Sequence, residues 1–118
     1  MQYLLMIYGD EAAMQGATPE QIKTMTEAYA KFTQDIVQSG HLKGGDRLKS
    51  SNTATTIRRG DGKPLMTDGP FAETREQLTG YYIIEAKDLD EATAIADRIP
   101  LAAGAVEVRP IDSMARQY

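Results

Sequence analysis

Apolar residues alternate with polar ones, or run on without interruption, in the segments that we expect to form strands. Two of these segments, residues 3–8 and 81–86, are apolar on both faces, which is typical of central strands that are covered on two sides. A last strand with alternating valine and charged residues is expected over 106–110. A short strand is also expected over 42–49, although this segment contains two adjacent glycines.

A β-hairpin is predicted in the middle of the chain. Residues 53–59 are rich in β-branched side chains that alternate with others, and residues 65–67 would form the returning strand. Between them, Asp61-Gly62 is a strong signal for a two-residue hairpin turn. Nearer the N-terminus, residues 9–17 carry no periodic pattern and are expected to form a loop.

The longer of two predicted helices covers residues 19–39. Thr18 is a good N-cap, Pro19 suits the first helical position, and Gln21 completes a capping box. Gly40 is expected to end the helix in a left-handed conformation. The apolar residues recur at spacings of three and four and therefore form one stripe: Ile22, Met25, Tyr29, Phe32 and Ile36.

A second, shorter helix is predicted after Asp88, which caps it with Glu91 at the capping-box position, and Pro100 stops it. Its apolar face consists of Ala92, Ile95, Ala96 and Ile99. The elements thus follow the order strand, long helix, strand pair, strand, short helix, strand. With right-handed crossovers this order predicts an α+β fold, a ferredoxin-like βαββαβ antiparallel sheet with both helices on one face.

The other face of that sheet would have nothing from the chain to cover it, although its residues are apolar. On the first strand, Leu4, Met6 and Tyr8 lie opposite the other apolar set. A second copy packed sheet to sheet resolves this, since isologous dimers are the commonest oligomers. We therefore expect a homodimer. A charge at Ile84 or Leu5, whichever faces the partner, is expected to abolish pairing.

Composition narrows the classes of function. The 118 residues are enough for a single domain, 1–118, and their net charge of −4 without a dense basic cluster argues against nucleic-acid binding. Without cysteine, thiolate catalysis and cysteine-ligated metals are excluded. One histidine and no recurring carboxylate spacing predict neither a metal site nor a cofactor. The first apolar run is too short for a signal or membrane span, so we expect a cytoplasmic protein that does not bind membranes.

One segment carries a specific motif. Residues 68–76 read Asp-Gly-Pro-Phe-Ala-Glu-Thr-Arg-Glu, and the stretch over 68–85 resembles the DGPFAETKE branch of the YCII-related proteins nearly letter for letter. Arg75 stands where that motif has lysine. Further agreements extend the resemblance over essentially the whole chain: residues 8–11, 44–46, 53–56 and 106–110.

The resemblance implies a dimeric α+β barrel with a cleft between the sheet and the loops. It also implies two kinds of function. Some relatives resemble small-molecule enzymes with a His–Asp pair whose histidine lies on the first helix, but residues 19–39 contain no histidine, so this pair is not carried over. Other members resemble proteins encoded beside extracytoplasmic-function sigma factors, which suggests an accessory role.

Asp68, Glu73 and Arg75 are the candidate residues for chemistry in the motif. As carboxylates at a cleft mouth, Asp68 and Glu73 could act as catalytic acid and base, and Arg75 could hold an anionic ligand. The structural alternative is that Asp68 caps an Asp-Gly-Pro turn. Glu73 would then be a solvated charge on a short helical turn, paired with Gln77 four residues on.

Tyr81, Tyr82 and His41 are the remaining candidates for ligand binding. The two tyrosines point to opposite faces of a strand, so one could offer its hydroxyl to a cleft while the other packs in the core. His41 lies at the end of the first helix, where it is more often a solvated cap. Asp46 and Arg47 could form an ion pair, which has little diagnostic value.

Two hypotheses of different classes remain open. The first is a small-molecule-binding, enzyme-like dimer with carboxylate acid/base chemistry and no metal. The second is a non-catalytic accessory or regulatory protein that contacts a sigma-factor-associated protein. The first requires polar groups that converge in a partly dry pocket, and the second requires an exposed apolar patch.

Overall fold

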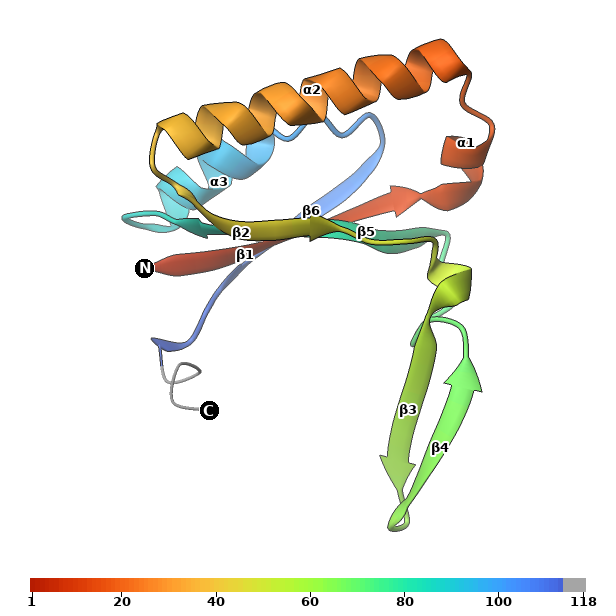
Figure 1. The fold of residues 1–118 in the computed structure, drawn as a ribbon. Helices are drawn as coiled ribbons and strands as arrows, with labels where there is room; N and C mark the ends of the chain where they lie inside the picture. Colours follow the sequence, from red (N-terminus) through yellow and green to blue (C-terminus); the bar gives the residue numbers. More distant parts are fainter. Residues whose placement is uncertain (114–118) are drawn as a thin grey trace.

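The computed structural model describes residues 1–113 and consists of one four-stranded sheet, a separate two-stranded sheet and helices (Figure 1). In chain order the elements are β1 (Gln2–Asp10), α1 (Glu11–Gln15), α2 (Pro19–Gln38), β2 (Leu42–Arg47), the 3₁₀ turn η1 (Ser51–Thr53), β3 (Thr55–Gly60), β4 (Lys63–Asp68), β5 (Glu76–Glu85), α3 (Leu89–Asp97) and β6 (Gly104–Pro110).

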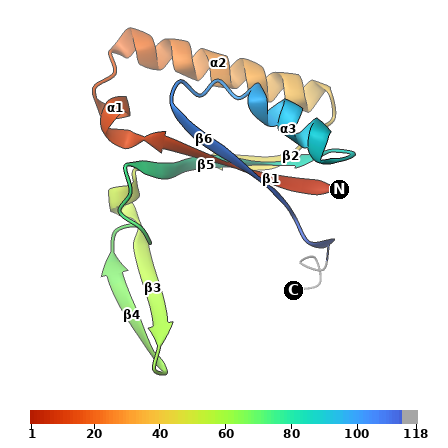
Figure 2. The same ribbon diagram turned by 180° about the vertical axis from the view of Figure 1, so that it is seen from behind.

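The four-stranded sheet has the order β2-β5-β1-β6, and every neighbouring pair is antiparallel. Helices α2 and α3 both lie on the same face of this sheet, as the two opposite views agree (Figures 1 and 2). The mixed α+β class, the antiparallel sheet and the one-sided helix layer are therefore confirmed. No helix within the described part of the chain is long and apolar enough to cross a membrane.

Strict alternation along β1 decides which side chains enter the core. Tyr3, Leu5 and Ile7 are buried, whereas the residues between them are only half-buried. The core beneath the helices consists of Tyr3, Leu5, Ile7, Phe32, Ile36, Ile84, Ala86, Ala92, Ile95, Ala96 and Ile99. Leu5 and Ile84, predicted as alternatives for the pairing surface, are both fully buried on the helix side. Both side chains point to the same face of the sheet as Tyr3, because Ile84 pairs directly with Tyr3 and Leu5 follows it by two residues on β1. A charge at either position would therefore enter the core and not the predicted pairing surface.

The long helix follows its predicted signals at both ends. The Thr18 side chain accepts from the Gln21 backbone N–H, and the Gln21 side chain accepts in return from Thr18. Gly40 has φ +81°, the left-handed conformation that glycine adopts without strain. The apolar stripe is only partly covered, since Phe32 and Ile36 are buried but Ile22 remains 51% exposed. The N-terminal part of α2 extends beyond α3 (Figure 1).

The loop predicted over residues 9–17 was wrong in part. Strand β1 continues to Asp10, and the short helix α1 follows it directly. The reason is local: the Asp10 carboxylate accepts hydrogen bonds from the backbone N–H groups of Ala12 and Ala13 at 3.0 and 3.3 Å. This cap satisfies donors that would otherwise be free at the helix start.

The predicted hairpin forms, but it does not join the main sheet. β3 and β4 pair only with each other, and Asp61 and Gly62 have φ +50° and +77°, as a two-residue hairpin turn requires. We call residues 55–68 the arm. It projects from the face of the sheet that the helices leave uncovered (Figures 1 and 2). The edge of the four-stranded sheet next to β5 is formed by β2 and not by the hairpin. Gly45 in β2 lets the backbone approach Tyr81 closely.

Candidate functional site

The loop that carries the DGPF motif does not gather its charged residues. Asp68 ends β4 at the base of the arm and is exposed, as is Glu73 farther along. The predicted helical turn at Glu73 is absent: residues 69–75 contain only bends, and the Gln77 amide donates to the carbonyls of Ala72 and Thr74 at 2.8 and 2.9 Å. These backbone contacts replace the expected pairing of Glu73 with Gln77.

Arg75 forms its ion pair outside the motif. Its Nε donates to the Asp10 carboxylate at 2.9 Å, although the arginine side chain is 87% exposed. Within residues 1–113, neither Asp68 nor Glu73 forms an ion pair. The three residues that the motif placed together are therefore not one cluster in this chain.

His41 lies far from this loop, at the other end of β5. Its Nδ1 is 2.7 Å from Ser39 Oγ and its Nε2 is 3.3 Å from Glu91 Oε1. Because the His41 carbonyl accepts from Glu85 N–H, the length of β5, about 30 Å, separates His41 from Arg75. His41 therefore links the end of α2 to the start of α3, and it does not share a site with the motif loop of its own chain.

The two tyrosines point to opposite faces of the sheet, as predicted. Tyr82 lies beneath α2, where its hydroxyl is 2.8 Å from Thr33 Oγ1 and its ring packs edge to face on Phe32. Tyr81 lies on the uncovered face and donates to the Asp46 carboxylate at 3.0 Å. This hydrogen bond to the carboxylate, and its charge, raise the pKa of Tyr81. Tyr82 is therefore a core residue, and only Tyr81 can meet a ligand on the uncovered face.

Tyr81 belongs to a row of side chains that crosses all four strands on the uncovered face. Asp46 pairs with Tyr81, Tyr81 with Met6, and Met6 with Glu107, and directly opposed residues lie about 5 Å apart. This polar row has a carboxylate at each end, and Glu107 forms an ion pair with Arg109, which lies beside Leu4 on the same face. Together with its apolar neighbours it makes up what we call the open sheet face: Leu4, Met6, Tyr8, Asp46, Tyr81, Ile83 and Glu107.

Two adjacent carboxylates hold the arm in place. The Glu11 carboxylate accepts from the backbone N–H of Ser51 at 2.8 Å and from its hydroxyl, on the leg that leads into β3. Asp10 accepts from Arg75, on the leg that leaves β4. We call Asp10 and Glu11 the brace, because each one ties a different leg of the arm to the end of β1.

The brace lowers the pKa of both carboxylates. The Arg75 hydrogen bond is the largest cause for Asp10, and the Ser51 hydroxyl is the largest for Glu11. A carboxylate whose pKa is lower in the folded state stabilises that state above its unfolded pKa, and this contribution is lost as pH falls through the folded value.

We therefore expect the unfolding free energy to fall as pH drops from about 5 to about 2. Asp10→Asn and Glu11→Gln should each lower stability at pH 7 and flatten this acid limb, as measured by urea unfolding at a series of pH values. Glu73→Gln is the matched control, because Glu73 is exposed and forms no ion pair. If the unfolding free energy of the double variant Asp10→Asn/Glu11→Gln still fell at low pH as steeply as that of the wild type, this role would be contradicted.

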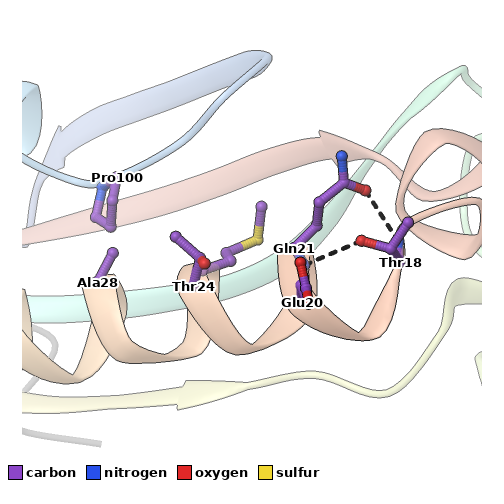
Figure 3. Close-up of a pocket in the computed structure, with 7 residues that line it drawn as sticks. Thr18, Glu20, Gln21, Thr24, Ala28 and Pro100 are labelled. Atoms are coloured by element: carbon purple, nitrogen blue, oxygen red, sulfur yellow. Dashed lines mark hydrogen bonds between the residues drawn. The ribbon is translucent and has the colours of Figure 1, made fainter.

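A separate hollow of about 550 Å³ lies on the helix side, between α2 and Pro100 (Figure 3). Its polar groups are largely those of the Thr18–Gln21 capping box, whose two hydrogen bonds Figure 3 shows. Since these groups already satisfy one another, the hollow offers a ligand little beyond shape. Its lining consists of Thr18, Glu20, Gln21, Thr24, Met25, Ala28 and Pro100.

Sequence reasoning missed the two best-defined polar contacts, at Asp46 and at the brace. A signal for both was present, because residues 8–11 and 44–46 are among the segments that carry the family resemblance. Each of them falls on or directly after a strand. The expected Asp46–Arg47 ion pair does not form, since consecutive strand residues point to opposite faces and Asp46 accepts from Tyr81 instead. Within residues 1–113 no group of three or more histidine, aspartate or glutamate side chains is arranged to hold a metal.

These features define an antiparallel α+β fold with helices on one face of the sheet, a polar row on the other and a braced hairpin arm. The YCII-related domain matches residues 1–115, and the chain belongs to this family. An uncharacterized protein of Rhizobium meliloti (strain 1021), R00369, is 34% identical over 114 residues, which covers 94% of this chain and 92% of the relative.

Proposed function

We propose that the chain is a ferredoxin-like subunit that pairs through its open sheet face as a dimeric α+β barrel, and that the pair binds a small molecule between the sheets. The hydrogen bond between Tyr81 and Asp46 carries the proposal, because it sets a donor and a carboxylate among Leu4, Met6 and Ile83. Ligand sites combine such apolar surface with a few polar groups in this way.

In this site Asp46 is the group suited to acid/base chemistry. Its carboxylate can accept a proton from a bound ligand, while the Tyr81 hydroxyl can donate a hydrogen bond to a ligand oxygen. Asp68 and Glu73, the acid/base candidates of the motif, lie on the arm and its outgoing leg. Their catalytic role stays a prediction. In the proposed dimer, Asp68 and Glu73 could reach the polar row only if they came from the second subunit.

The alternative is a non-catalytic accessory protein that acts through a partner protein, such as a sigma-factor-associated protein. The arm favours it, because its exposed apolar side chains, Ile57, Leu65 and Met66, offer a contact surface without any polar pocket.

A thermal-shift screen against a metabolite library tests the proposed binding. A ligand at 100 times its dissociation constant adds roughly 2.7 kcal/mol, which raises the melting temperature of a domain of this size by roughly 10 °C. We expect Tyr81→Phe and Asp46→Asn to lose this shift. Tyr82→Phe is the matched control, since it removes a hydroxyl from the helix side and should keep the shift.

Each other outcome has a definite meaning. A ligand whose shift survives Tyr81→Phe and Asp46→Asn but is lost in Asp68→Asn would move the site to the motif loop. A native mass near 13.0 kDa at micromolar concentration would contradict the dimer. If no ligand binds and the native mass is that of a dimer, the accessory function becomes the better proposal.

A further inference from the structure

We propose that the arm of one subunit packs across the open sheet face of the second copy, with Ile57 and Met66 as its contact residues. In this position Arg59 would reach the polar row of the partner and complete the site. The inference rests on the proposed pairing and adds to it which surface of the arm makes the contact.

The arm has the properties of a surface that needs a partner. All of β4 and all of β3 except Thr56 are exposed, with Ile57 at 55% and Met66 at 68%. A two-stranded hairpin is marginally stable by itself in water, yet the arm has a regular ladder of six residue pairs. A projecting apolar hairpin of this kind is typical of an interaction site.

The two sides of the arm differ in what lies against them. Ile57 pairs with Met66, so both side chains lie on one side of the arm. Arg59 and Pro64, which pair two residues further along the strands, lie on the same side. On the other side the chain returns over itself: the Arg58 guanidinium lies 4.6 Å from the Phe71 ring centroid. We therefore assign the side with Ile57 and Met66 to the partner.

The position of the arm favours a second copy as that partner. The arm projects from the same side of the sheet that the helices leave open (Figures 1 and 2). A two-fold-related copy that faces this sheet therefore lies in the space beside the arm, and in an isologous pair each arm meets the other subunit.

The available area agrees with a stable pair. The four strands of the open sheet face present roughly 500 Å² and the two-stranded arm roughly 200 Å² more, from the strand spacing and rise. A standard interface buries about 800 Å² on each partner. The sheet face alone falls short of that value, and the arm supplies most of the difference.

Charge adds a second reason. On the contact side the arm carries one basic side chain, Arg59, with Asp68 at its base, whereas the whole chain has a net charge of −4. The polar row of the partner subunit ends in Asp46 and Glu107. Glu107 already pairs with Arg109, so Asp46 is the carboxylate that Arg59 on the contact side would face. Arg59 would then also attract an anionic ligand, such as a small carboxylic acid, to the Tyr81 hydroxyl.

The brace gives the arm a fixed direction before it meets the partner. Glu11 holds the incoming leg through Ser51, and Asp10 holds the outgoing leg through Arg75. A segment that is already held in its bound orientation loses less conformational freedom on association, which strengthens binding.

Adjacent residues on opposite sides of β4 provide the test. We expect Met66→Lys to raise the dimer dissociation constant at least 100-fold in sedimentation experiments, whereas Leu65→Lys, equally exposed but on the Arg58 side, should change it less than 5-fold. Circular dichroism checks that both variants are folded. Trypsin cleavage after Arg58 and Arg59 gives a second readout, and it should be at least 10-fold slower in wild-type dimer than in diluted, monomeric protein.

The outcomes separate this inference from the proposed pairing. A wild-type chain that is monomeric at all concentrations overturns both. A wild-type dimer that Met66→Lys and Leu65→Lys weaken equally, with arms cleaved as fast as in the monomer, overturns only the role of the arm. Slower cleavage together with selective weakening by Met66→Lys supports it.

Discussion

Ile84→Asp should abolish the native fold, whereas Ile83→Asp, one residue earlier, should leave a folded monomer. Ile84 is fully buried opposite Tyr3 beneath the helices. An unpaired carboxylate there, with the loss of apolar contacts, costs about 5 kcal/mol or more. That approaches the total stability of a small domain, about 5–15 kcal/mol. Ile83 pairs with Leu4 on the open sheet face, where an added carboxylate can stay hydrated in a monomer.

Far-UV circular dichroism with urea unfolding measures the first effect, and sedimentation velocity measures the second. Ile83→Asp should show wild-type helix and strand content, a cooperative transition and half the wild-type native mass. Ile83→Ala controls for the lost side chain and should weaken the dimer less. A dimeric Ile83→Asp variant would contradict pairing through the open sheet face, and a stably folded Ile84→Asp variant would contradict the burial of that residue.

Gly104→Ala should be the second large effect, with an expected loss of about 3 kcal/mol or more. Gly104 begins β6 with φ +133°, and a Cβ there would come within 2.0 Å of the Tyr8 carbonyl oxygen. Backbone strain of this kind costs about 1–3 kcal/mol by itself. The clash is with backbone in the neighbouring strand β1, so a rotamer change cannot relieve it.

Gly40→Ala is the matched control for this prediction. Gly40 also has a positive φ, +81°, but nothing lies within 4 Å of the added Cβ. It should therefore cost only about 1 kcal/mol, the conformational part of the effect. Urea unfolding midpoints at a constant m-value give both differences. Equal losses in the two variants would mean that the close approach of Gly104 to β1 does not matter.

The elements that the sequence predicted well are those with local causes. Thr18, Pro19 and Gln21 define the start of α2, and Asp61-Gly62 defines the hairpin turn, because each signal acts within a few residues. Alternation in β1 and β5 identified the two faces of the sheet in the same way. The weak strand over 42–49 formed despite its glycines, since pairing with β5 outweighs local preference.

The candidate site was less predictable, because it depends on which segments the fold brings together. Asp68, Glu73 and Arg75 are neighbours in the motif, yet Arg75 contacts Asp10, 65 residues away. Tyr81 could be assigned a partner only once β2 was placed beside β5, which brought Asp46 to its hydroxyl. Long-range contacts of this kind leave no periodic trace in a single sequence.

By itself, the sequence determined the α+β class, the positions of α2 and α3, the hairpin turn and the two-faced sheet, because hydrophobic period, capping and turn chemistry are local properties. The family followed separately from the motif over residues 68–85. Only the tertiary structure decided that Leu5 and Ile84 face the helices, that the hairpin stands apart as an arm, and that Asp10 and Glu11 hold its legs. Strand register and loop direction follow from packing over the whole chain, and packing joins residues that are far apart in sequence.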